Sequence, residues 1–270
     1  MKRIIAFVFC FIFSLFLISC EKTEDAVSIH VIDIGKADCI VIETGGKNIM
    51  IDTGERSDVF DITRYLSDRG IEKIDLLILT HFDKDHIGGA SELILKYDVD
   101  TVIENSFYCD RDEYREYHDL IEERGILNKI LTEDYSFKLG ACSFTVYPPK
   151  KSSYNKKEDN NSSLIVSMEH GEGRFLFCGD AMEERLNEFI EETPLRFDFV
   201  KLPYHGNYLK NYDEFIKETS PSFCVITCSK KNPADDRTIE LLSRYNIEVL
   251  QTVNGSVQVT SDGKNITVSQ

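Results

Sequence analysis

One short stretch constrains the fold of this chain more than any other. The apolar run Ile74–Leu79 is interrupted only by Asp75, so it predicts a central strand buried on both faces. Directly after it, His81, Asp83, Asp85 and His86 occur within six residues, and two glycines follow. Imidazoles and carboxylates this close together need a cation to hold them, and mixed His and Asp ligands suit Zn²⁺ or Mn²⁺. The stretch therefore predicts a metal site at the end of a buried strand.

The spacing His-x-Asp-x-Asp-His, followed by Ile-Gly-Gly, resembles the metallo-β-lactamase superfamily, whose commoner pattern is His-x-His-x-Asp-His. The Asp at the third position resembles the hydrolase domain of the ComEC competence family. Residues 33–38 and 51–54 are also similar to that family's Asp-Val-Gly-Gln-Gly-Asp and Ile-Asp-Thr-Gly, with Lys36 and Ala37 in place of Gln and Gly. The resemblance implies an α/β fold, the metallo-β-lactamase-type αββα sandwich, in which two mixed β-sheets lie face to face with helices outside.

The resemblance also implies two divalent metal ions, Zn²⁺ or Mn²⁺, and the remaining ligands. Asp180 follows a buried strand in a Gly-Asp pair, where the family places a carboxylate that bridges two metals; the alternative is a helix N-cap. His205 stands in Tyr-His-Gly-Asn, where the family usually has His-His-Gly-Ser. We expect His81 and Asp83 to hold one metal, with Asp180 between the two metals. The other metal is expected at Asp85, His86 and His205.

Other polar residues are expected to support the site. Asp52 either orients a ligand or caps a turn. Asn161 either supplies an amide oxygen to a metal that is short of one ligand or only holds its loop. Lys84 and Lys201 either reach a substrate oxygen or remain solvated. Tyr204 replaces one of the family's two histidines, which would weaken the second metal if the replaced histidine is the family's ligand.

Two adjacent metals would ionise a shared water near neutral pH and neutralise charge on substrate oxygens. With Asp85 and Asp180 as the catalytic carboxylates, we expect an exported, membrane-anchored metal-dependent hydrolase. Its substrate is expected to be a phosphoester, with nucleic acid among the candidates, which makes it a phosphodiesterase or nuclease. However, 31 Lys and Arg against 47 Asp and Glu give a net charge of −16, which argues against a broad nucleic-acid-binding face.

Two other functions stay open at this stage. One is a cell-envelope phosphoester hydrolase of the phosphorylcholine esterase type. The other is a catalytically degenerate lipoprotein that only binds metal or ligand. This option stays open because Lys36, Ala37 and Tyr204 differ from the family pattern.

The first twenty residues predict a targeting segment. Lys2 and Arg3 precede the sixteen uncharged residues 4–19, fewer than the roughly 20 needed to cross a bilayer. The ending Leu-Ile-Ser-Cys at 17–20 resembles a bacterial lipoprotein leader, which implies acylation of Cys20 and an extracytoplasmic protein anchored to the bacterial cell membrane. The alternatives are an ordinary secretory leader, which would give a secreted protein, and a single anchor helix. Residues 21–26 would then form a short tether and 27–270 one hydrolase domain.

The pattern of turns predicts the ends of the domain. Strands at 27–33, 39–43 and 48–51, joined by tight turns, predict an antiparallel meander. A helix is expected over 58–69. Near the end of the chain we expect a strand at 223–227, a helix at 238–245 and a strand at 249–253, with hairpin turns at 254–255 and 262–263.

We expect Cys20 to be the mature, acylated N-terminus. Mass spectrometry of the membrane-extracted protein should find the mass of residues 20–270 increased by that of the acyl groups. A Cys20→Ser variant, which lacks the thiol, serves as the control. An unmodified Cys20 in the membrane-extracted protein would contradict the prediction.

Overall fold

The computed structural model describes residues 26–193 and 196–270. The expected leader, Cys20 and all of the tether except Ala26 lie outside the described residues. In the part of the chain that is described, no helix is both long and apolar enough to cross a membrane.

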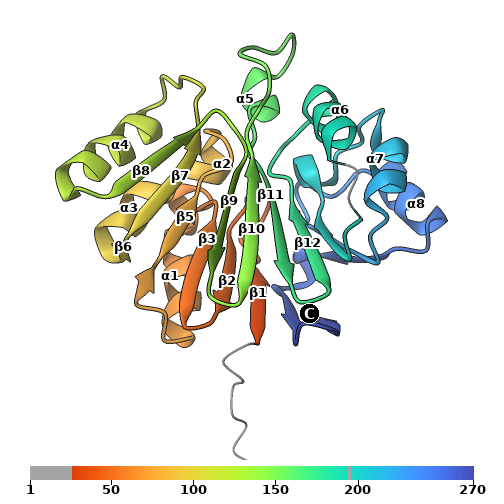
Figure 1. The fold of residues 1–270 in the computed structure, drawn as a ribbon, viewed down its shortest axis with the longest axis horizontal. Helices are drawn as coiled ribbons and strands as arrows, with labels where there is room; N and C mark the ends of the chain where they lie inside the picture. The colour runs from red at the N-terminus through yellow and green to blue at the C-terminus, as the bar shows by residue number, and fades with distance from the viewer. Residues whose placement is uncertain (1–25, 194–195) are drawn as a thin grey trace, which may run out of the picture.

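Two large sheets form the centre of the molecule (Figure 1). The first has eight strands in the order β17-β16-β1-β2-β3-β5-β7-β8. In chain order its strands are β1 (Val27–Val31), β2 (Ile40–Thr44), β3 (Lys47–Ile51), β5 (Leu76–Ile78), β7 (Thr101–Asn105), β8 (Leu127–Leu131), β16 (Val257–Ser261) and β17 (Ile266–Ser269). A separate pair joins β4 (Lys73–Ile74) to β6 (Asp98–Val99).

The second sheet has seven strands in the order β15-β14-β13-β12-β11-β10-β9. They are β9 (Tyr135–Leu139), β10 (Cys142–Tyr147), β11 (Ile165–His170), β12 (Gly173–Phe177), β13 (Phe199–Lys201), β14 (Phe223–Ile226) and β15 (Glu248–Gln251). Both sheets are mixed. Strands β3, β5, β7 and β8 run parallel in the first sheet, β12 to β15 run parallel in the second, and the other pairs are antiparallel.

Three layers of apolar side chains explain why the sheets stack. One cluster lies between the sheets and contains, for example, Ile29 and Ile42 from the first and Phe144 and Phe175 from the second. Two further clusters cover the outer faces, each packed under helices. Because each fully buried Ile, Leu or Phe contributes about 1.5–3 kcal/mol, the sheets are stable only when both faces are covered. This is the αββα sandwich that the sequence predicted.

The helices divide between the two outer faces (Figure 1). The first sheet carries α1 (Val59–Asp68), α3 (Ala90–Lys96) and α4 (Asp112–Arg124), and the second carries α6 (Glu183–Glu192), α7 (Tyr212–Thr219) and α8 (Asp236–Arg244). The short elements are α2 (Lys84–Ile87), α5 (Glu158–Asn161), η1 (Arg56–Asp58), η2 (Pro203–Gly206) and η3 (Thr252–Asn254).

Strand β5 occupies the central, doubly buried position that its apolar run predicted. It pairs in parallel with β3 on one side and β7 on the other. Leu76 and Ile78 point into the core between the sheets, whereas Leu77 packs under the outer helices. The strand therefore delivers the residues that follow it to the rim of the sandwich at its carboxyl end.

The meander β1–β2–β3 and the hairpin at 262–263 are confirmed. The hairpin expected at 254–255 is wrong, because β15 and β16 belong to different sheets and this turn carries the chain from one to the other. A local Asn-Gly signal marks a turn but does not show which strands the turn joins.

The two sheets approach closely at a pair of glycine turns. Gly45, between β2 and β3, faces Gly140, between β9 and β10, and both have positive φ, at 52° and 59°. A Cβ on Gly140 would lie well inside van der Waals contact of the Thr44 carbonyl oxygen.

Gly140→Ala should therefore lower the free energy of unfolding by about 2–5 kcal/mol, from the left-handed backbone plus the clash. Gly125→Ala is the matched control, because Gly125 has a similar φ of 63° but no atom lies within 4 Å of the place that an added methyl group would take. It should cost only about 1 kcal/mol. Urea unfolding of both variants gives the difference, and equal losses would show that the contact between the turns is unimportant.

Candidate metal centre

Three buried histidines point the same ring nitrogen, Nε2, toward one space. His81 follows β5, His86 lies in α2 and His205 lies in η2. The ring centroids of His81 and His86 are 4.1 Å apart, and those of His86 and His205 are 5.4 Å apart. Within the described residues, all three Nε2 atoms are buried and have no hydrogen-bond partner. An unpaired buried nitrogen is costly, so three together indicate a missing partner.

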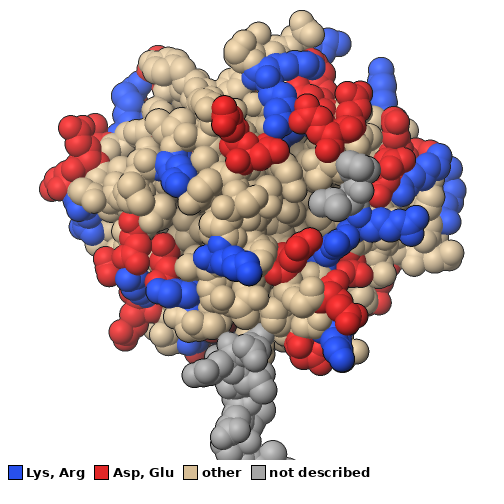
Figure 2. All heavy atoms as spheres, viewed as in Figure 1, with Lys and Arg blue, Asp and Glu red and all other residues tan. Residues whose placement is uncertain are grey.

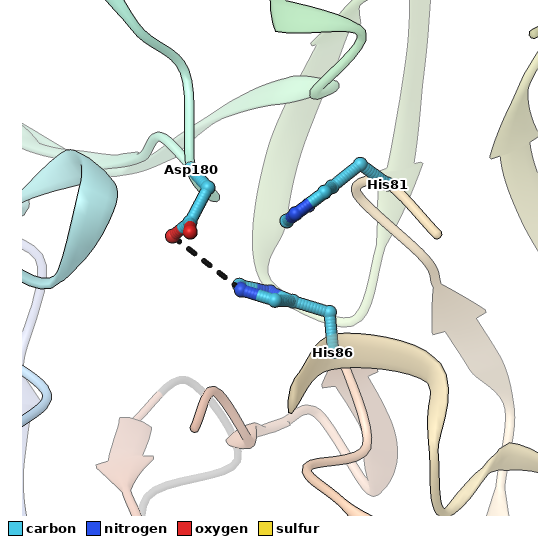
Figure 3. A group of neighbouring side chains, drawn as sticks. All are labelled: His81, His86 and Asp180. Atoms are coloured by element: carbon cyan, nitrogen blue, oxygen red, sulfur yellow. Dashed lines mark ion pairs between the residues drawn. The ribbon is translucent and has the colours of Figure 1, made fainter. Parts of the chain in front are cut away.

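Two carboxylates face these nitrogens. Asp180 Oδ1 lies 3.4 Å from His86 Nε2, the ion pair dashed in Figure 3, and 3.2 Å from His205 Nε2. It too is buried without a hydrogen-bond partner in the described chain. Asp85 Oδ2 lies 3.4 Å from His205 Nε2. Asp180 does not cap a helix, because α6 begins at Glu183 with Met182 as its N-cap.

Asp52 fixes two of the three histidine rings. Its carboxylate accepts hydrogen bonds from the Thr80 backbone N–H (2.8 Å) and the Thr80 hydroxyl (2.7 Å), and lies 2.7 Å from His86 Nδ1. A carboxylate only accepts, so His86 carries a proton on Nδ1. The Thr80 hydroxyl has given its single hydrogen to Asp52, so it accepts from His81 Nδ1 at 3.2 Å.

Asp38, in the loop between β1 and β2, does the same for His205. The Thr227 hydroxyl donates to Asp38 Oδ1 at 2.6 Å and therefore accepts from His205 Nδ1 at 2.9 Å. The other oxygen of Asp38 accepts from the buried Lys201 ammonium. Sequence reasoning missed Asp38, although it ends the Asp-Ile-Gly-Lys-Ala-Asp segment that resembles the family pattern.

The donor set fits divalent metal ions. With Nδ1 protonated, each imidazole presents an Nε2 lone pair to the shared space, which is the form that binds metal. The ligand atoms of His81, His86 and Asp180 lie within 4.8 Å of one another, and so do those of Asp85, His86 and His205. These five residues can hold two metal ions, and Asp52 and Asp38 fix the orientation of the histidine rings through hydrogen bonds.

The electrostatics favour a bound cation. Burial opposes the charge on Asp180, but His205 and His86 outweigh it and hold the pKa of Asp180 well below its ordinary value. Burial likewise opposes charge on His86, yet Asp180 and Asp52 raise its pKa well above the usual range. The space between the ligands therefore attracts positive charge, so a proton and a metal ion compete for His86 Nε2.

A strained turn presents His205. Tyr204 and His205 both have a φ of 51°, a conformation that costs roughly 1–2 kcal/mol per residue outside glycine. The turn is held by the Tyr212 hydroxyl, which donates to the Pro203 carbonyl at 2.6 Å. Strain kept in place by such contacts is typical of functional sites.

Asp83 lies at the edge of the group. Its Oδ2 is 3.7 Å from His81 Nε2, while its Oδ1 accepts a hydrogen bond of 2.6 Å from Arg111. Lys36 contacts Asp85 in a similar way, at 3.0 Å. No signal in the sequence linked Arg111 to the site, because it lies on a surface loop far along the chain.

The structure contradicts the substrate role expected for Lys201 and places Lys84 at the surface. Lys201 is fully buried and paired with Asp38, so its ammonium cannot reach a substrate. Lys84 is largely exposed, but its amino group lies 3.0 Å from Glu113 of α4.

Asn161 takes the second of its two expected roles, and Tyr204 points away from the metal space. The Asn161 side-chain oxygen accepts from the Arg185 backbone N–H at 3.2 Å and its amide nitrogen donates to the Lys156 carbonyl, so it holds the loop and does not face the metal space. Its neighbour Asn160 instead donates to Asp180 Oδ2 at 3.1 Å. The Tyr204 ring packs against the outer apolar cluster of the second sheet.

Comparison with known proteins agrees with this fold and site. Residues 32–222 match the family model of the metallo-beta-lactamase superfamily, and the chain belongs to that superfamily. Membership implies divalent metal ions, often two.

Curated relatives confirm the resemblance to the ComEC-type competence proteins. The chain is 28% identical over 269 residues to ComE operon protein 3 of Bacillus subtilis (strain 168), covering 91% of this chain and 34% of the relative. It is 25% identical over 259 residues to Recombination protein 2 of Haemophilus influenzae, covering 93% and 30%. The chain thus spans about a third of the length of these relatives.

Solved structures show the fold at low identity. YhfI from Bacillus subtilis, a metallo-beta-lactamase fold protein, has a TM-score of 0.59 at 11% identity, covering 85% of this chain and 98% of YhfI. CmlA from Streptomyces venezuelae, a diiron beta-hydroxylase, has a TM-score of 0.54 at 12% identity, covering 87% and 54%. Likeness at this identity shows the fold alone, so the reaction must be argued from the site.

Asp180→Ala should lower the metal content of the purified protein from about two ions toward one or none, because a shared carboxylate serves both positions. The fold should persist, since a core of this size does not depend on metal. Plasma mass spectrometry measures the metal and circular dichroism the fold. His170→Ala is the control, because His170 is buried but bonded to Ser261 outside the site. A folded Asp180→Ala protein with undiminished metal would contradict the prediction.

Proposed function

We propose that this protein is an exported, lipid-anchored metal-dependent phosphodiesterase. The observation that carries the proposal is a group of buried atoms that have no hydrogen-bond partner in the described chain: the Nε2 atoms of three histidines and Asp180 Oδ1. Bound divalent ions would supply Lewis-acid polarisation of a substrate oxygen and would acidify water. Zn²⁺ and Mn²⁺ are the ions that this mixture of imidazole and carboxylate donors suits.

The chain's own residues prepare this chemistry before a substrate arrives. Asp52 and Asp38 set the orientation of the histidine rings through their hydrogen bonds, so that no ring has to turn during the reaction. Asp180 and Asp85 each present a carboxylate oxygen to His205 Nε2, at 3.2 Å and 3.4 Å. Oxygen donors of this kind favour phosphate esters over β-lactam amides.

The surface charge bears on the substrate. Figure 2 shows acidic and basic side chains interspersed over one face, without a broad basic field there. Together with the net charge of −16, this argues against tight binding along a DNA duplex. We therefore propose a phosphodiester held locally at the metal centre, either in a nucleic acid end or strand or in a cell-envelope ester such as phosphorylcholine.

A second candidate is a lipoprotein that binds metal or ligand without catalysis. The observation that favours it is Tyr204, which stands where the family pattern has a second histidine and whose ring packs away into the apolar cluster. The metal centre would then have one imidazole fewer on the side of the second sheet.

Hydrolysis of phosphodiester reporters tests the proposal. The Zn²⁺- or Mn²⁺-loaded protein should hydrolyse bis-p-nitrophenyl phosphate, and Asp85→Asn should lower kcat/KM by about 100-fold or more. Asp75→Asn, which removes a buried carboxylate at the other end of β5, should retain activity. Comparing p-nitrophenyl phosphorylcholine with a p-nitrophenyl nucleotide ester separates the two substrate sources. A metal-loaded protein that hydrolyses none of these reporters would favour the binding lipoprotein.

A further inference from the structure

Lys36 lies at the open side of the metal centre. It belongs to the loop between β1 and β2, and its amino group lies 3.0 Å from Asp85 Oδ2, the oxygen that is 3.4 Å from His205 Nε2. The Lys36 and Asp85 side chains are 29% and 19% exposed, whereas His205 is 2% exposed. The Lys36 ammonium therefore stands between the buried ligand atoms and solvent.

The other cations near the site are already engaged. Lys201 is sealed against Asp38. Arg111 Nη2 is shared between Asp83, at 2.6 Å, and Asp159, at 3.0 Å. An ammonium has three N–H donors, and in the described chain the Lys36 ammonium has one carboxylate partner, Asp85. It has donors left for an incoming oxygen.

The charge balance of the centre calls for an anion. Six carboxylates and three cationic side chains meet there, a surplus of three negative charges, which two divalent ions would turn into a surplus of one positive charge. The carboxylates belong to Asp38, Asp52, Asp83, Asp85, Asp159 and Asp180, and the cations to Lys36, Arg111 and Lys201. A phosphodiester or phosphate supplies the missing negative charge. Lys36 is a partly exposed cation that contacts Asp85, the carboxylate that lies 3.4 Å from His205 Nε2.

We propose that Lys36 is a specificity-determining residue that binds an anionic phosphoryl oxygen of the substrate at the open side of the metal centre. This rests on the proposed function, since it names the group by which a phosphoester would be recognised. The family pattern has Gln at this position, which can donate a hydrogen bond but carries no charge. This chain would therefore bind its anionic group more tightly than a chain with Gln.

Calorimetric titration of inorganic phosphate into the metal-loaded full chain tests this. Lys36→Gln should weaken phosphate binding about tenfold or more, while Lys36→Arg should retain most of the affinity because the charge stays. Lys47→Gln is the matched control: Lys47 makes a similar 2.8 Å contact to Asp75 but lies at the opposite end of the first sheet. Metal content, measured by plasma mass spectrometry, should be the same in all four proteins.

Several results would overturn the proposal. Equal phosphate affinity in the wild type and Lys36→Gln would do so, as would absence of phosphate binding to the loaded wild type. Loss of metal from Lys36→Gln would make Lys36 a positioning residue for Asp85. An equal loss of phosphate affinity in Lys47→Gln would show that the effect comes from the net charge of the protein and not from the position of Lys36.

The titration does not depend on turnover, so it separates this proposal from the proposed function. Reporter hydrolysis without Lys36-dependent phosphate binding overturns only the role of Lys36. Phosphate binding through Lys36 without hydrolysis of any reporter overturns only the phosphodiesterase activity.

Discussion

Two buried carboxylates, Asp52 and Asp38, control the rest of the metal centre. Each accepts the single hydrogen of a threonine hydroxyl. That hydroxyl can then only accept a hydrogen bond from a histidine ring. The proton of that ring is thereby fixed on Nδ1, and Nε2 is left as a lone pair. Had either carboxylate been replaced by an apolar residue, a hydroxyl could rotate and a ring could take the other tautomer. The direction of three imidazoles thus follows from acceptors that never touch the shared space.

The parts of the fold that the sequence predicted are those where one strong local pattern decides. The apolar run before His81 could only be a doubly buried strand, and β5 is one. The placement of the polar residues at its end followed from that strand. Asp180 and His205, by contrast, were expected beside it only through the resemblance to a family, because nothing local shows which strand ends meet at one rim.

The lysines show why the rest could not be predicted. Lys201 and Lys84 are close in sequence to candidate ligands, but the direction of a side chain depends on what the fold packs against it. Lys201 points to a carboxylate 163 residues earlier in the chain, and Lys84 turns to the helix that lies over it. Asn160 and Asn161 differ only by one step around a single helical turn, yet one faces Asp180 and the other a backbone N–H. A sequence contains no signal for such choices.

The ligand groups come from both sheets, His81, Asp85 and His86 from the first and Asp180 and His205 from the second. A metal pair held by them would act as a cross-link between two halves of the chain whose residues are about a hundred positions apart. Because the ligand groups are brought together only in the folded chain, the binding free energy of the metal ions would add to the stability of the folded state. The metal ions would then join the two sheets mechanically as well as chemically, so that separating the sheets and releasing the metal become a single event.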